Sequence, residues 1–142
     1  MKVLVVENEA QTLNDISFCI NVLYPHAAVI PITEGPKALK AIEMEEPELI
    51  IASSSLPDVG PLDLVRKIRK LSDAPLIFLT DIESGIEKAQ LLEGGADDCV
   101  GKPMSAIEFL AVVRALLRRT NHLGYKQDQT ISLGNGLSVN IG

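Results

Sequence analysis

Residues 47–58 read PELIIASSSLPD, and this stretch decides the fold class. Every residue from Leu49 to Ala52 is apolar, which is typical of a central parallel strand whose two faces are both covered. Three serines follow at once, and Pro57 with Asp58 indicates a turn. We therefore predict a buried strand over residues 49–52 that runs into a polar loop beginning at Ser53.

The rest of the chain alternates in the same way. Apolar runs predict further strands over residues 2–6, 28–32, 76–79 and 98–101. Helical spacing of apolar residues predicts helices over 9–23, from Pro36, over 62–71, over 86–92 and from a capping box at Ser105. These strand–helix units predict an α/β fold, a five-stranded parallel sheet with the flavodoxin-like order 2-1-3-4-5 and helices on both faces.

Smaller features refine this expectation. Pro31 places the second strand at an edge of the sheet, and Gly94 with Gly95 ends the fourth helix. The inner face of the second helix is expected to hold Ala38, Leu39, Ile42 and Met44. The apolar side of the fifth helix is expected to hold Ile107, Leu110, Val113, Leu116 and Leu117.

Composition narrows the function classes. The 142 residues carry a net charge of −6, which argues against nucleic-acid binding by this segment itself. No apolar run approaches the length of a membrane span, so we expect a cytoplasmic protein without membrane contact. Cys19 and Cys99 are expected to be buried small apolar residues, because no cysteine–histidine cluster has zinc spacing.

In an open parallel sheet the functional crevice lies at the carboxyl ends of the strands. This rule alone selects residues 7–9, 53–55, 80–81 and 101–102.

Several short motifs occur together along residues 2–119: Leu56-Pro57-Asp58, Leu79-Thr80, Gly95-Ala96-Asp97-Asp98 and Lys102-Pro103. In combination they resemble the receiver domain of bacterial two-component response regulators. The resemblance implies a phosphoacceptor crevice formed by Glu7, Asn8, Ser53, Thr80 and Lys102, and a switch position at Cys99. It also implies a cis peptide bond between Lys102 and Pro103.

Three positions depart from the pattern that the resemblance implies. Ser53 stands where receivers carry the phosphoacceptor aspartate, and a hydroxyl cannot form an acyl phosphate. Asn8 is neutral as well, so Glu7 is the only carboxylate at positions 7, 8 and 53, and Glu9 could add another for Mg²⁺ only if its loop bends back. We expect neither a metal nor another cofactor. Cys99 replaces the aromatic switch residue. We therefore predict a degenerate crevice in which Lys102 pairs with Glu7.

Resemblance to the OmpR/PhoB type of regulator implies a homodimer through the fourth helix, the fifth strand and the fifth helix. Lys88 would pair with Glu108, and Asp97 with Arg119, across the interface. Val112 stands where an arginine opposite Asp98 is expected, which favours an apolar contact that Leu91 or Leu92 would share. The residues of this predicted dimer face are Lys88, Asp97, Asp98, Glu108, Val112 and Arg119.

The last segment changes character. Residues 121–129 are polar, and residues 130–141 alternate around Asn135-Gly136, which predicts a hairpin. We expect residues 1–120 to form the receiver-like domain. Residues 121–142 are expected to form a linker and the start of a winged-helix DNA-binding domain.

These features favour a non-enzymatic, phosphorylation-independent receiver that mediates dimerisation of a transcription regulator and reaches DNA only through a downstream domain. A partner protein or small ligand could tune it. Two alternatives stay open. One is an adaptor that binds a partner protein without a DNA-binding output. The other is a Mg²⁺-dependent phosphoacceptor that uses a displaced carboxylate. Serine-hydrolase chemistry is not expected, because no histidine lies in a crevice segment.

Overall fold

The computed structural model describes residues 1–81 and 83–129, with side chains described through Thr120. The chain divides into two compact units, Met1–Leu110 and a second one that begins at Ala111. The first unit holds the sheet and all the crevice residues, and it is described by itself. The predicted hairpin at 130–141 lies outside the described residues.

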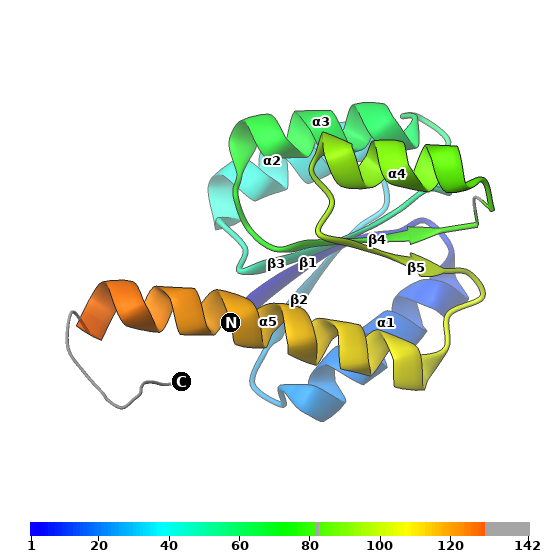
Figure 1. The fold of residues 1–142 in the computed structure, drawn as a ribbon. Helices are drawn as coiled ribbons and strands as arrows, with labels where there is room; N and C mark the ends of the chain where they lie inside the picture. Colours follow the sequence, from blue (N-terminus) through cyan, green and yellow to red (C-terminus); the bar gives the residue numbers. More distant parts are fainter. Residues whose placement is uncertain (82, 130–142) are drawn as a thin grey trace. The chain divides into compact units, whose positions relative to one another are not determined.

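Strands and helices alternate as predicted (Figure 1). The strands are β1 (Lys2–Val6), β2 (Ala28–Ile32), β3 (Leu49–Ser53), β4 (Leu76–Thr80) and β5 (Asp98–Gly101). The helices are α1 (Ala10–Leu23), α2 (Gly35–Glu45), α3 (Pro61–Leu71), α4 (Gly85–Gly94) and α5 (Ala106–Gln129). All strand pairs are parallel and the order is β2-β1-β3-β4-β5, so the predicted flavodoxin-like fold is confirmed.

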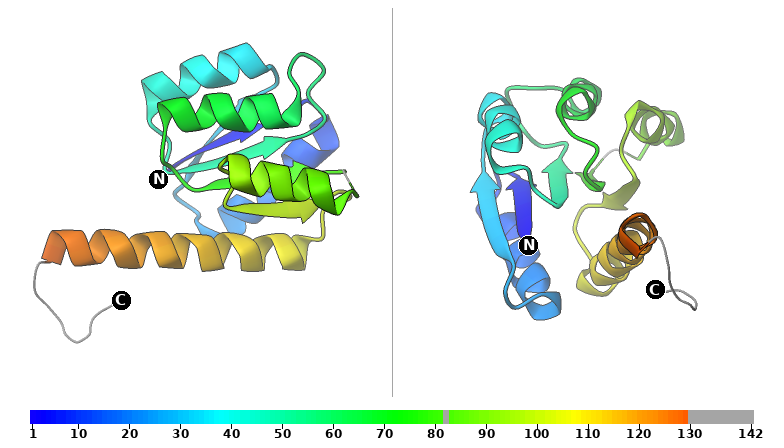
Figure 2. Two further views of the ribbon diagram at one scale, coloured as in Figure 1. Left: turned by 45° about the horizontal axis from the view of Figure 1, so that its top comes forward. Right: turned by 90° about the vertical axis from the view of Figure 1, so that its left-hand side faces the viewer.

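Helices cover both faces of this sheet. Helices α2, α3 and α4 lie on one face and α1 on the other (Figures 1 and 2). Both β3 and β4 are buried along their whole length, as their continuous apolar runs predict. The core under α2–α4 is formed mainly by Leu4, Val6, Ala38, Ile42, Ile50, Ala52, Leu56, Leu64, Val65, Ile68, Leu76, Phe78, Leu91 and Ala96.

Local signals fix the ends of the helices. Gly95 follows α4 with φ of 134°, a conformation that suits glycine, and its N–H bonds the carbonyls of Leu91 and Leu92. The Ser105 hydroxyl accepts a hydrogen bond from the Glu108 N–H at the start of α5, in agreement with the predicted cap. Pro31 lies in β2, which is an edge strand as predicted.

Three expectations about burial were wrong. Met44 is 74% exposed and Ile107 is 83% exposed, although both were assigned to inner helix faces. Phe109 is 0% exposed and takes the inward position at the start of α5 instead. Because Ile107 and Phe109 are two residues apart on a helix, they cannot share one face. Cys19 is buried as expected, whereas Cys99 is only half-buried.

The fifth helix is also longer than expected. It runs through Gln129, whereas the sequence predicts a polar linker from residue 121. Among the described residues, no helix is both long and apolar enough to cross a membrane.

Candidate functional site

The parallel register brings the predicted crevice residues together at the carboxyl-terminal ends of the strands. Glu7 follows β1, Ser53 ends β3, Thr80 ends β4 and Lys102 follows β5. Ser53 is paired with Leu79 on β4, and Thr80 with Gly101 on β5, so the strand ends are level. The crevice therefore forms where the topology rule predicts it.

The Lys102 ammonium is the centre of this crevice. Its Nζ lies 3.1 Å from Glu7 Oε1, 3.1 Å from Ser53 Oγ and 3.1 Å from Ser55 Oγ. An ammonium group has three hydrogens to donate, so these three oxygens use all of them. The side chain of Lys102 is only 12% exposed. The predicted ion pair with Glu7 is thus confirmed, and the peptide bond to Pro103 is cis, as the resemblance implied.

Ser55 links the two sides of the crevice; the topology rule selected it with residues 53–55, but the set of crevice residues that the resemblance implies left it out. Its Oγ lies 2.9 Å from Glu7 Oε2, 3.1 Å from Asn8 Oδ1 and 2.9 Å from Ser53 Oγ. Its backbone N–H also donates to Ser53 Oγ at 3.2 Å. The serine repeat at positions 53 and 55 is the signal that could have indicated its contact with Ser53.

Glu7 is the only fully buried carboxylate among the described residues, with 0% exposure. Burial raises its pKa, but hydrogen bonds from the Glu9 N–H, the Lys102 ammonium and the Ser55 and Ser53 hydroxyls outweigh burial and hold the pKa below its usual value. Glu7 therefore stays ionised at neutral pH, and it keeps Lys102 fixed as its counter-ion.

The lowered pKa of Glu7 predicts a specific loss of stability in acid. A carboxyl group whose pKa is lower folded than unfolded stabilises the fold above the unfolded value, here 4.5, and that stabilisation disappears as pH falls through the folded-state pKa. Glu7→Gln should therefore flatten the decline in unfolding free energy below pH 4.5. Urea unfolding of the wild type and the variant at a series of pH values measures this, and parallel declines in the two proteins would contradict it.

The other carboxylates near the crevice have partners of their own. Both oxygens of Asp58 accept the N–H of Gly35 at the start of α2, at 3.1 and 3.3 Å. Asp81 Oδ1 accepts the Ser54 hydroxyl at 3.1 Å. Thr80 is buried, and its carbonyl accepts the Lys102 N–H at 3.0 Å. The crevice loops are thus held together by direct bonds between protein groups.

The crevice does not suit a divalent cation. Such an ion needs several hard oxygen ligands and carboxylate charge. Over residues 1–81 and 83–120, no group of three or more acidic, histidine or cysteine side chains is placed to hold a metal. Glu7 is the one buried carboxylate there, and the Lys102 ammonium already neutralises it.

A pocket of about 480 Å³ opens beside this network. Ser55 and Lys102 form part of its lining, together with Pro103 and Met104 from the loop after β5. The first turns of α1 supply the facing wall. The network is therefore reachable from solvent on this side.

The comparisons with known proteins agree with this geometry. Residues 3–114 match the response regulator receiver domain family. The chain belongs to this family. A match of 34% identity over 131 residues to the probable transcriptional regulator ycf27 of Guillardia theta covers 92% of this chain and 51% of that protein. A match of 37% identity over 117 residues to KdpE of Mycobacterium tuberculosis covers 82% of this chain and 51% of that protein.

The solved structures show the same fold. A two-component response regulator from Clostridium difficile superposes with a TM-score of 0.78 at 23% identity, over 85% of this chain and 98% of that one. The curated relatives are longer: this receiver domain spans about half of their length.

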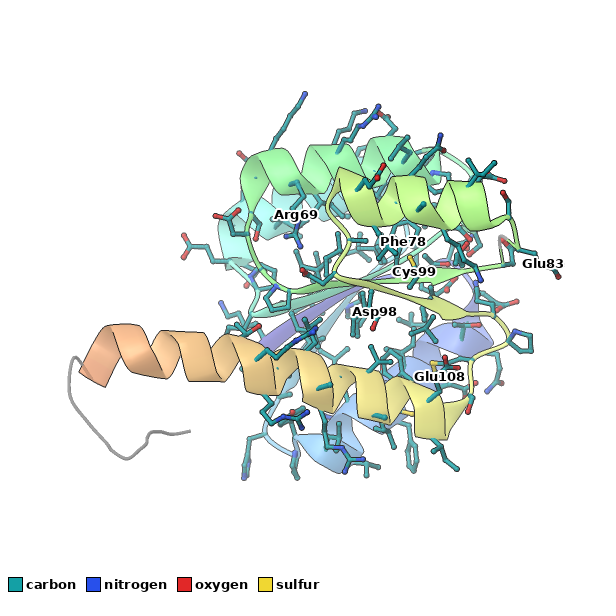
Figure 3. The ribbon with its side chains drawn as sticks, viewed as in Figure 1. Arg69, Phe78, Glu83, Asp98, Cys99 and Glu108 are labelled. Carbon is teal, nitrogen blue, oxygen red and sulfur yellow. The ribbon has the colours of Figure 1, made fainter. Side chains whose placement is uncertain are left out.

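Cys99, which the resemblance assigns to the switch position, lies beside the core. Cys99 is paired with Phe78 in the β4–β5 register, and both lie on the α4 side of the sheet, with Asp98 on the other side (Figure 3). Burial raises the pKa of the Cys99 thiol, the Asp98 carboxylate raises it further, and Lys88 opposes them. Cys99 is therefore a neutral thiol that packs partly against the core.

Two residues expected at the dimer face are already engaged within the chain. Asp97 Oδ2 accepts hydrogen bonds from Arg69 Nη2 and from the Leu76 N–H, both at 2.8 Å. Arg69 also donates to the carbonyls of Gly95 and Ala74, so it ties the end of α3 to the segment before β5. Leu91 is 2% exposed and packs in the core, so only Leu92 of that pair is available at the surface.

Proposed function

We propose that this chain is the receiver of a transcription regulator that works without phosphoryl transfer, and that its output is dimerisation. The observation that carries the proposal is the state of Ser53. Its hydroxyl is buried and bonded to Lys102 and Ser55 at the position where the family resemblance calls for the acceptor aspartate.

The contacts of Ser53 support the proposal that it does not accept a phosphoryl group. A serine becomes a nucleophile when a neighbouring base removes its proton. The carboxylate that accepts the Ser53 hydroxyl is Glu7, and its lowered pKa makes it a poor base for that task. The three donors of the Lys102 ammonium are all in use, so none is free to stabilise incoming phosphoryl oxygens.

The transcriptional role rests on the relatives. Two relatives matched over most of this chain, ycf27 and KdpE, are described as transcriptional regulators, and this chain spans about half of each. We infer that DNA is contacted by another part of the protein, because the −6 net charge makes this segment a poor DNA ligand. A cytoplasmic location follows from that role.

The alternatives that the sequence leaves open can be weighed against these contacts. A displaced phosphoacceptor would have to be Asp58 or Asp81, and both carboxylates are held by hydrogen bonds. The oligomeric state distinguishes the remaining alternative: a protein-binding adaptor is expected to be monomeric, and the proposed regulator is expected to be a dimer.

The proposed dimer face lies on α4, β5 and the start of α5. In the first unit Glu108 and Leu92 are exposed and Lys88 is half-exposed, while the exposed Ile86 adds apolar surface on α4 that the sequence analysis overlooked. The internal Arg69–Asp97 pair makes Asp97 a weak candidate for a contact with a partner's arginine. Apolar contact should therefore supply most of the affinity, with Val112 contributing as its sequence position predicts.

Val112→Asp is expected to weaken the dimer more than Lys88→Ala. Val112→Asp removes apolar contact area and, on the pattern that the resemblance implies, places a second carboxylate near Asp98. Lys88→Ala removes only an exposed ion pair, which contributes about 0–1 kcal/mol. Sedimentation of the wild type and both variants over a concentration series measures the two dissociation constants. A wild type that remains monomeric at high micromolar concentration would contradict the dimer model and favour the adaptor.

A further inference from the structure

We propose that Arg69 is a positioning residue for the proposed dimer face: its guanidinium fixes α4 and β5 from the end of the sheet opposite the crevice, and so sets how tightly the chain dimerises. The inference rests on the proposed function, because it concerns the same face. It assigns control of assembly to a side chain that lies in neither the crevice nor the interface.

The Arg69 guanidinium joins three segments of the chain. Its Nη1 donates to the carbonyls of Ser72 and Ala74, which follow α3, at 3.2 and 2.6 Å. Its Nε donates to the Gly95 carbonyl at the end of α4, at 2.7 Å, and its Nη2 to Asp97 Oδ2 directly before β5, at 2.8 Å. The Arg69 side chain is only 19% exposed. These bonds are therefore better protected from water than those of an ordinary surface ion pair.

Gly95 shows how closely Arg69 packs on the end of α4. A β-carbon at position 95 would overlap with Arg69 Cγ, so any larger residue there would displace the arginine. Leu91 is the one residue of α4 that is buried, and it lies in the last turn of the helix. Both attachments of α4, Leu91 and the Arg69 contact, are thus at its carboxyl-terminal end.

Asp97 extends the same restraint into the sheet. Its Oδ2 accepts the Leu76 N–H as well as Arg69 Nη2, and its own N–H donates to the Leu76 carbonyl at 2.8 Å. These bonds lie at the amino-terminal ends of β4 and β5, whereas the crevice lies at their carboxyl-terminal ends. Figure 3 shows Arg69 at the end of α4 that lies away from Glu83. A change at Arg69 therefore acts on the dimer face without touching the crevice.

Loss of the guanidinium has two opposing consequences for the dimer. It frees Asp97 for an arginine of a second copy, but an exposed ion pair adds little affinity. It also removes four hydrogen bonds that hold α4 and the start of β5 in one arrangement. Association must then order these elements anew, which weakens binding. Because four half-buried bonds are exchanged for one exposed pair, the second consequence is the larger.

The test is Arg69→Met in the 142-residue chain, a change that keeps an aliphatic stem and removes the guanidinium. The Ala96 and Asp97 amides donate to the carbonyls of Leu91 and Leu76, and their protection from hydrogen exchange should fall about tenfold more than that of the β3 amides. Sedimentation over a concentration series should give a dimer dissociation constant about tenfold above that of the wild type.

Control variants separate positioning from a general loss of stability. Ile68→Val trims a wholly buried neighbour on α3, so it should lower stability without a selective loss of protection or a change in the dissociation constant. Arg66→Met removes an exposed arginine from the same helix and should behave as the wild type does. If Arg69→Met does not fold, Arg69→Lys takes its place, since it keeps the charge but loses the planar fork and should show the same selective changes.

Two results overturn the inference. One is a uniform loss of protection across the fold, which would make Arg69 a general stabiliser. The other is a selective loss of protection with an unchanged dissociation constant, which would separate Arg69 from assembly. A monomeric wild type would contradict the proposed function and the role of Arg69 in assembly together. The wild type alone therefore tests the proposed function, and the variants test Arg69.

Discussion

Lys102→Met should lower the unfolding free energy by about 3 kcal/mol at neutral pH in the absence of metal, because removal of one partner of a buried ion pair leaves the other charge uncompensated. The stranded group is the Glu7 carboxylate, which is fully buried. Ser53 and Ser55 would each lose a hydrogen bond as well. Chemical denaturation monitored by circular dichroism measures the loss.

A double-mutant cycle with Glu7→Gln separates the charge from packing. Once Glu7 is neutral, Lys102→Met no longer strands a carboxylate, so its further cost should be smaller by about 2 kcal/mol. Additive costs within error would contradict the ion-pair account. They would mean that Lys102 stabilises the crevice only through the packing of its aliphatic stem.

Phe109→Ala should cost about 3–5 kcal/mol of unfolding free energy, whereas Ile107→Ala, two residues away on α5, should cost almost nothing. Phe109 is wholly buried and Ile107 is 83% exposed, so the first change opens a cavity and the second removes a side chain that faces solvent. Denaturant midpoints of the two variants give the comparison directly. Equal losses would mean that the start of α5 is turned differently about its axis.

Ile107 and Phe109 also show how far the sequence could predict the fold. The strands β1, β2 and β5 were predicted at their observed limits, whereas β3 and β4 each run one residue further than their apolar runs predict, into Ser53 and Thr80. Ile107, Phe109 and Leu110 lie within one helical turn, and their spacing alone does not say which of them faces inward. Packing decides that, and it selected Phe109.

The positions of the crevice residues were also predictable, but not all of their contacts were. The topology rule and the family motifs placed Glu7, Ser53 and Lys102 together, and the structure brings them into contact. The topology rule included Ser55, but its bridging role was not predicted because that role depends on the path of the loop after β3. That path carries its hydroxyl to both Glu7 and Asn8.

The charged residues before and along β5 show a different limit. Sequence suggested Asp97 as a dimer contact, since acidic and basic residues occur at matching places. Its observed partner is Arg69, which lies 28 residues earlier in the same chain. A pattern of charges does not distinguish a bond within a chain from one between chains, so such assignments depend on the tertiary structure.

The most direct test of the central claim is intact-mass measurement after incubation with acetyl phosphate and Mg²⁺. The wild type should gain no phosphoryl mass, since Ser53 is an unactivated hydroxyl bonded to Lys102 and Ser55. Ser53→Asp alone should gain little, because Asn8 still leaves the metal short of charge, whereas Asn8→Asp with Ser53→Asp should gain more. A stoichiometric phosphoryl adduct on the wild type would contradict the account.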